Sequence, residues 1–250
     1  MQIDSSNIEI RKIKKANLKG GTIIDGFVSA GGLINPIAAG CFMHSPKNEL
    51  VAVLDSPVFP ALSIIYDTAP NFPARIYANE DQKLAIFQSE LKLDQSYYYS
   101  ISKTILRWAI DNECELIISA AAIYDEEFKG SEAAEPQDNI LAVASTKRAE
   151  EKLKNAGITQ LSSGSINGIP ALLLNEGAWT NFDVIVLLVK VPKEVSDFRA
   201  AATASEAIIK LVPGLSCDIN SLLNEAEIME KNLRKVRAEQ SRQNDISVYR

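Results

Sequence analysis

The chain has 250 residues, of which 46% are hydrophobic and 23% are charged, an ordinary balance for a folded globular protein. This length corresponds to one large domain or two small ones. The formal net charge of −6 argues against a nucleic-acid-binding protein, and no apolar run is long enough to span a membrane.

The first ninety residues are expected to alternate between strands and one helix. Residues 1–20 predict an edge strand with a charged lead-in, and Gly20-Gly21 separates it from a buried strand at 22–28. A turn of small residues at 29–32 leads into an apolar helix at 33–43. Further strands are expected at 50–54, 62–66, 74–78 and 83–88, with a loop bounded by Pro70 and Pro73 and a hairpin joining the last two strands.

The remainder of the body continues this alternation. Asp94 is expected to cap a helix at 95–112, and the most apolar run, at 184–191, is expected to form a central strand. Ser196 is expected to cap a helix that ends at Lys210. The other predicted elements are a buried strand at 115–119, a polar loop at 125–137, a strand at 140–144, a short charged helix at 146–155 and a turn with a strand at 164–174.

Helices that alternate with strands favour one α/β domain with three layers, in which a mixed, largely parallel sheet lies between helical layers. Residues 1–217 are expected to form this body. Residues 218–238 are expected to form a helix that projects from the body, and residues 239–250 a flexible tail.

A heptad pattern distinguishes the projecting helix. Its apolar residues recur at intervals of three and four, which predicts one apolar seam that packs against a partner helix. The chain is therefore expected to form a homo-oligomer, a tetramer or similar. Asp218 or Ser221 is expected to cap the helix. The seam residues are Ile219, Leu222, Ala226, Met229, Leu233 and Val236.

The end of the chain is unusual for an exposed tail, because Val248-Tyr249-Arg250 follows a polar stretch. One interpretation is a tail that packs on its own domain, or an apolar end that arose by chance. The other is a docking peptide, in which Val248 fills an apolar pocket, Tyr249 adds a ring and a hydroxyl, and the carboxylate pairs with a lysine or with backbone N–H groups. Six basic and three acidic residues give 230–250 a charge of +3, which suits an acidic partner.

The three cysteines, Cys41, Cys114 and Cys217, are far apart and odd in number. This pattern predicts reduced thiols in a cytoplasmic protein. The N-terminal residues lack the apolar core of a signal peptide.

The sequence offers little evidence of catalysis. The single histidine, His44, is expected at a helix end and has no neighbouring ligands for a metal. Glycines at 26–32 follow a strand but do not match a phosphate-binding fingerprint, so close approach of strand and helix explains them more simply. We therefore expect no catalytic residues, no metal, no cofactor, no nucleic-acid partner and no membrane partner.

Four stretches resemble the PAC2 family, the proteasome assembly chaperones and their archaeal relatives. The resemblance extends from about Gly21 to Met229. The stretches are 24–33, 85–90 with Trp108 downstream, 168–173, and 197–201, which leads to Leu222 and the last helix. The chain departs from the family at Ala120-Ala121-Ala122, where members often carry glycines, and in its own loop at 125–137.

The resemblance implies a body similar in topology to nucleoside phosphorylases, without their chemistry, and ATP-independent binding to proteasome α-subunits. The hydrophobic-Tyr-X end, Val248-Tyr249-Arg250, is similar to the tails with which proteasome activators and assembly factors enter pockets between α-subunits of the core particle. The alternative is a nucleoside-binding or nucleotide-binding protein, or an enzyme, that uses a phosphorylase-like cleft. A third possibility is an oligomeric scaffold with an unrelated partner.

Overall fold

A computed structural model describes residues 8–28, 32–66, 68–124, 139–191 and 197–228. Three members of the predicted seam, Met229, Leu233 and Val236, lie outside these residues. The whole predicted tail at 239–250 lies outside them too, including Val248, Tyr249 and Arg250.

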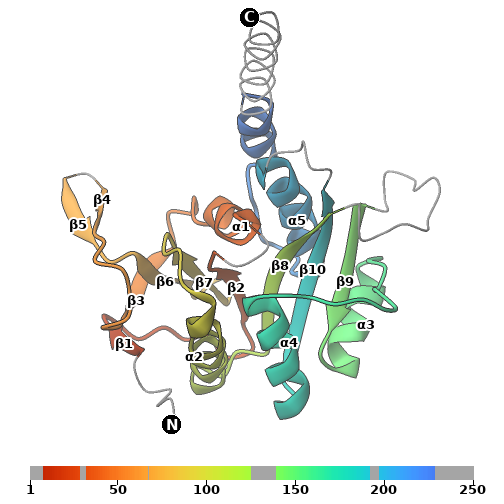
Figure 1. The fold of residues 1–250 in the computed structure, drawn as a ribbon, viewed down its shortest axis with the longest axis horizontal. Helices are drawn as coiled ribbons and strands as arrows, with labels where there is room; N and C mark the ends of the chain where they lie inside the picture. Colours follow the sequence, from red (N-terminus) through yellow and green to blue (C-terminus); the bar gives the residue numbers. More distant parts are fainter. Residues whose placement is uncertain (1–7, 29–31, 67, 125–138, 192–196, 229–250) are drawn as a thin grey trace, which may run out of the picture.

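The described residues form one mixed sheet of eight strands. Its strands are β1 (Glu9–Lys12), β2 (Thr22–Gly26), β3 (Glu49–Asp55), β6 (Ala74–Asn79), β7 (Leu84–Ser89), β8 (Leu116–Tyr124), β9 (Ile140–Ala144) and β10 (Asp183–Val191). Their order is β1-β3-β6-β7-β2-β8-β10-β9 (Figure 1). The four neighbours β7, β2, β8 and β10 run parallel, and antiparallel strands flank them on both sides. The predicted α/β class with a mixed sheet is confirmed.

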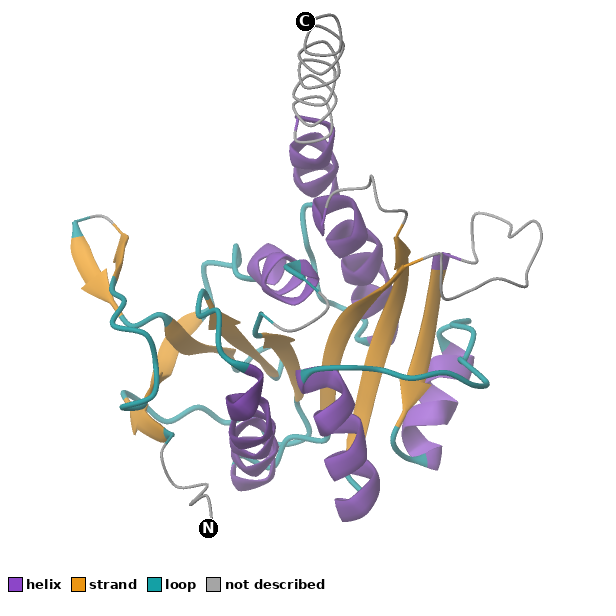
Figure 2. Ribbon diagram, viewed as in Figure 1, coloured by secondary structure: helices purple, strands orange, loops and turns teal. Residues whose placement is uncertain are grey.

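Helices cover both faces of this sheet and complete the three predicted layers (Figure 2). They are α1 (Ile34–Phe42), α2 (Tyr98–Asp111) with a short 3-10 turn η1 (Gln95–Tyr97) before it, α3 (Lys147–Asn155), α4 (Ile169–Thr180) and α5 (Asp197–Leu211). Residues of α2 and α4 pack into one apolar cluster on the sheet. Residues of α1, α3 and α5 pack into the other, on the opposite face. The parallel strands are thus buried on both faces, as their nearly continuous apolar sequence predicts.

Local signals in the sequence explain where several elements begin. The Asp94 carboxylate accepts the N–H of Ser96 at 2.9 Å, and the Thr146 hydroxyl accepts the N–H of Ala149 at 3.1 Å. The predicted cap at Asp94 is therefore confirmed, and Thr146 is a second cap that was not predicted; each side chain satisfies a donor that the helix leaves unpaired. The predicted cap Ser196 lies outside the described residues.

Gly26 explains how closely α1 packs on the sheet. A Cβ atom at this position would lie 2.1 Å from the carbonyl oxygen of Phe87 and 2.8 Å from the Cβ of Ala39 on α1. Neither distance is sterically possible, so only glycine lets the strand and the helix approach this closely. The close-approach interpretation of this glycine is confirmed.

Three predictions about elements need correction. Residues 169–174 form the start of α4, not a strand. Pro70 lies within a short strand, β5 (Ala69–Asn71), which pairs with β4 (Ile64–Tyr66) in a separate hairpin. The apolar run at 184–191 lies within β10, which is second from the sheet edge rather than central, because burial under α4 and α5 makes a strand apolar wherever it stands in the order.

Candidate functional site: the base of the C-terminal helix

A helix begins at residue 219 and continues to the last described residue, 228. The Asp218 carboxylate accepts the N–H of Ser221 at 3.0 Å, so Asp218 caps this helix as predicted. The helix leaves the body beyond the first turn of α5 and points away from the sheet (Figure 1). Its base fixes how residues 219–228 leave the body.

An apolar cluster fixes this base to the body of the same chain. Leu222 is 8% exposed and packs with Cys41 of α1 and Ala202 of α5. Ile219 packs against the same cluster, and Ala226 is fully buried. The first half of the predicted seam is therefore used, at least in part, within its own subunit.

A disulfide bond joins Cys41, at the end of α1, to Cys217, just before the C-terminal helix. The two Cα atoms are 5.3 Å apart, a usual separation for a disulfide. The prediction of reduced thiols is therefore wrong for this pair. The sequence could not reveal the pairing, because the two cysteines are 176 positions apart and the fold alone brings them together.

Cys114 is the free cysteine of the described residues, and it is buried. Burial raises the pKa of its thiol to about 12, so the thiol stays protonated and unreactive. The cytoplasmic location, which was inferred from three reduced thiols, stays a prediction. Within the described residues, no helix is both long and apolar enough to cross a membrane.

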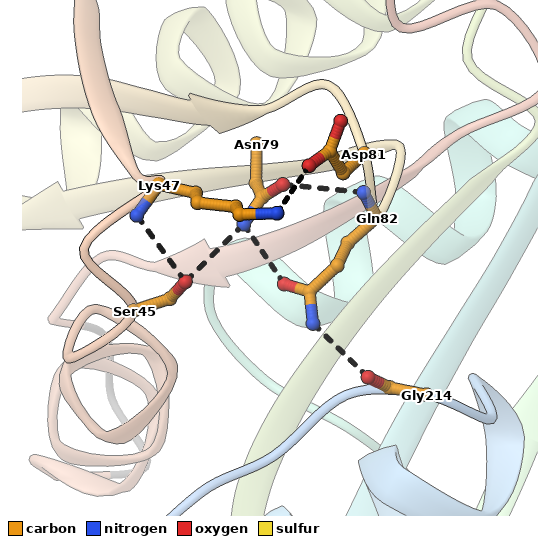
Figure 3. A network of polar contacts seen from close by, with 6 residues as sticks. All are labelled: Ser45, Lys47, Asn79, Asp81, Gln82 and Gly214. Atoms are coloured by element: carbon orange, nitrogen blue, oxygen red, sulfur yellow. Dashed lines mark hydrogen bonds and ion pairs between the residues drawn. The ribbon is translucent and has the colours of Figure 1, made fainter.

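A polar network holds the chain just before this base (Figure 3). The amide of Gln82 donates to the carbonyl of Gly214 at 3.0 Å and accepts from Asn79 at 3.0 Å. Asn79 also donates to the hydroxyl of Ser45, in the loop that follows α1, at 3.4 Å. Lys47 in that loop pairs with the exposed carboxylate of Asp81. The loops after α1, β6 and α5 are therefore tied together, and the C-terminal helix starts from a well-supported position.

A second polar cluster lies where β2 and β8 cease to pair, after Ile24 and Ile118. The buried Asp25 carboxylate accepts hydrogen bonds from the N–H of Phe27 at 2.9 Å, from Ser119 at 2.7 Å and from Asn35 at 3.3 Å. Asn35, at the start of α1, also accepts the N–H of Ala120 at 2.6 Å. Diverging strand ends are where open α/β sheets often bind ligands. Here these polar groups satisfy one another, so the cluster acts as a structural link between the two strands and α1.

Burial raises the pKa of Asp25 from 3.8 to about 6, although its hydrogen bonds oppose the change. A raised pKa in the folded state means that stability is lost as the pH rises from about 4 to about 6, by up to about 3 kcal/mol. The asparagine side chain in Asp25→Asn cannot ionise, so this variant does not lose stability through position 25 as the pH rises. We expect its unfolding free energy, relative to the original protein, to rise by about 2 kcal/mol between pH 4 and pH 7 in urea titrations. A difference that stays constant with pH would show that Asp25 does not titrate in this range.

His44 and the arginines that could bind a phosphate in a cleft do not assemble into a site. His44 lies at the end of α1, with its Nδ1 atom 3.2 Å from the carbonyl oxygen of Cys41. Arg11, Arg75 and Arg148 each pair with a different carboxylate, on Asp55, Glu90 and Asp183 respectively. Among the described residues, no group of three acidic, histidine or cysteine side chains could hold a metal ion. The alternative of an enzyme cleft gains no support from these positions.

The sequence pattern of the PAC2 family matches residues 23–237 of this chain, which include nearly all of the body and the base of the C-terminal helix. The chain belongs to the PAC2 family. None of the curated proteins compared with this chain matches it.

Solved structures of PAC2 relatives show the same fold. Pyrococcus furiosus PbaA, described as an archaeal homolog of a proteasome-assembly chaperone, superposes with a TM-score of 0.73 at 25% identity, over 94% of this chain and 99% of PbaA. PbaB of the same organism, described as an archaeal proteasome activator, gives a TM-score of 0.71 at 21% identity, over 92% of this chain and 99% of PbaB. A PAC2 family protein from Streptomyces avermitilis gives 0.61 at 14% identity, over 86% and 95%.

Proposed function

We propose that this protein is a non-enzymatic proteasome assembly chaperone or activator that binds α-subunits of the core particle through its C-terminal tails, without ATP. The observation that carries the proposal is the likeness to PbaA over nearly the whole of both chains. The Val248-Tyr249-Arg250 end supports it independently, because the tail lies beyond the residues that the family pattern covers.

The base of the C-terminal helix supports this role mechanically. The disulfide to Cys41, the packing of Leu222 and the Asp218 cap all act at the first turns of the helix. A helix held at its base presents the residues beyond it in a defined direction, and this lowers the entropy lost when the tail binds. The tail beyond the helix must be flexible to reach its pocket. As a flexible coil, residues 237–250 would span roughly 20 Å.

We assign the contact between copies to the C-terminal half of the seam, which we call the upper seam and which consists of Met229, Leu233 and Val236. The reason is that Leu222, in the other half, is already packed within its own subunit. Heptad spacing places Met229, Leu233 and Val236 on the same helical face as Leu222. If these residues join several helices, one assembly carries several identical tails. Each tail alone would bind weakly, and several tails on one ring would gain about 10²–10⁴-fold in avidity.

Charge in the upper seam is expected to break the assembly into smaller species. Met229→Glu with Leu233→Glu would place unpaired carboxylates between apolar helix faces, a costly arrangement. The measurement is the mass in solution by light scattering coupled to gel filtration. The matched control is Glu227→Gln with Glu230→Gln, two positions outside the seam. An unchanged mass in the seam variant would mean that this helix does not join copies of the chain.

Capture on purified α-subunit rings tests the function itself. Immobilised rings are expected to retain the full-length protein in the absence of ATP, and to retain less of it as free Val-Tyr-Arg-ending peptide is added. A protein that passes through the column unretained would not be a proteasome chaperone or activator of the proposed kind. Retention that the free peptide leaves unaffected would place the contact elsewhere on the body.

A further inference from the structure

A basic groove lies between the edge strand β1 and one side of helix α2, on a part of the molecule that the proposed function does not use. It consists of two hollows, of about 670 Å³ and about 240 Å³. Both are lined by Lys12, Trp108, Asp111 and Asn112. Figure 1 shows β1 and α2 at the opposite end of the body from the C-terminal helix. We define the basic groove by these two hollows together.

The walls of the groove come from both elements. Ile8, Ile10 and Lys12 alternate along the chain, so they point to the same face of the β1 segment. From α2, the half-exposed side chain of Tyr99 contributes aromatic surface, and Trp108, which is only 5% exposed, borders both hollows. The groove therefore offers apolar contact along its length in addition to charge.

Cations dominate the charge of this groove. Lys12, Lys15 and Arg107 line it, and the ion pairs of the described residues leave these three without a carboxylate partner. Two further lining cations, Lys14 and Lys103, are paired with Glu49 and Glu176. Asp111 is the single acidic lining residue in the two hollows. This excess of positive charge stands out on a chain whose net charge is −6.

The arrangement of these cations indicates the kind of ligand. They come from β1, from the segment after it and from α2, and they extend along two joined hollows instead of converging on one point. An extended peptide presents alternate side chains on one side about 7 Å apart, so repeated carboxylates could meet successive cations. We propose that the basic groove binds an extended acidic segment of a partner protein, with Lys12 and Arg107 as its principal charge contacts.

The test uses two fluorescein-labelled decapeptides, one alternating Glu and Ser and the other alternating Gln and Ser. Fluorescence anisotropy at low ionic strength is expected to show binding of the acidic peptide and not of the neutral one, and added salt should weaken it. Lys12→Glu with Arg107→Glu is expected to lower the affinity at least about tenfold, because complementary charges are replaced by like charges. The matched control, Lys152→Glu with Lys154→Glu on α3, is expected to stay within about twofold.

A second readout locates the peptide. The chain has two tryptophans, and Trp179 is 88% exposed, so Trp179→Phe leaves Trp108 in the groove as the sole tryptophan reporter. The acidic peptide should change the fluorescence of Trp108 at the concentrations that raise the anisotropy. Because charge reversal could disturb folding, Lys12→Gln with Arg107→Gln serves as a milder variant, and the thermal unfolding of each variant is measured.

Four results would overturn the proposal. They are equal binding of the neutral peptide, unchanged affinity in both groove variants, tighter binding of inorganic phosphate or ATP than of the acidic peptide, and binding that occurs only after deletion of residues 2–7. The third result would make the groove a site for small anions. The fourth would assign it to the N-terminal segment of the chain itself. None of these results bears on the capture by α-subunit rings, so the two proposals fail separately.

Discussion

Deleting residues 248–250 is expected to lower the apparent affinity for α-subunit rings by at least about 10²-fold, the low end of the avidity gained when several tails bind one ring. The deletion removes the side chain of Val248, the ring and hydroxyl of Tyr249, and the position of the terminal carboxylate together. Biolayer interferometry on surface-immobilised rings gives the affinity of the full-length oligomer and that of the deletion variant. Most of the loss should appear as faster dissociation.

Two matched variants separate the docking motif from the tail as a whole. Gln243→Ala alters the tail outside the motif and should leave the affinity within about twofold. One glycine added after Arg250 keeps every side chain but moves the carboxylate by one residue. It should weaken binding about as much as the deletion, because the carboxylate can no longer meet its partner. Full affinity in the deletion variant would refute docking by the tails.

Breaking the disulfide is expected to lower the unfolding free energy by about 3–5 kcal/mol. The bond closes a loop between residues that are 176 positions apart, so it strongly restricts the unfolded chain. Cys217→Ser should therefore unfold about 10 °C below the original protein. Hydrogen exchange in residues 219–228 should also increase, because the helix base then depends on the packing of Leu222 and its neighbours alone.

Thiol titration under denaturing conditions supports this measurement. We expect one reactive thiol per chain before reduction, from Cys114, and three afterwards. Cys114→Ala serves as the matched variant, since it removes a cysteine without affecting the bond. Reductant should lower the stability of Cys114→Ala and leave that of Cys217→Ser unchanged. Three reactive thiols in the oxidised protein, with equal stability in reductant, would show that the bond does not form.

The sequence predicted most of the α/β body because local signals and burial agree there. The β6–β7 hairpin, the cap at Asp94 and the close approach at Gly26 all depend on signals within short stretches of sequence. The apolar runs of β2 and β10 identify strands that helices cover on both sides, although such runs do not reveal the order of strands in the sheet.

The misassigned strand at 164–174 shows the limit of apolar periodicity. Its leucines form a short run that suits a buried strand or a buried helix equally well. The deciding signals lie at the ends of α4: Pro170 stands in its first turn, and Asn181 ends it in the left-handed conformation, with φ of 55°. These two residues could have identified the helix.

Contacts between residues that are far apart in the chain could not be predicted from the sequence, for a different reason. Lys12 and Arg107 meet at one groove, and Cys41 and Cys217 at one bond, only after the sheet has ordered its strands. The buried link of Asp25, Asn35 and Ser119 was missed in the same way. An aspartate within a strand that was predicted to be buried was the one local sign of it.

Native mass spectrometry of the protein mixed with α-subunits tests most directly whether several gathered chain ends recognise the proteasome. Full-length oligomers should form complexes with α-subunit assemblies, and the variant that lacks residues 248–250 should keep its own oligomeric mass but form none. Complexes of the same mass and abundance with both proteins would contradict the proposed function.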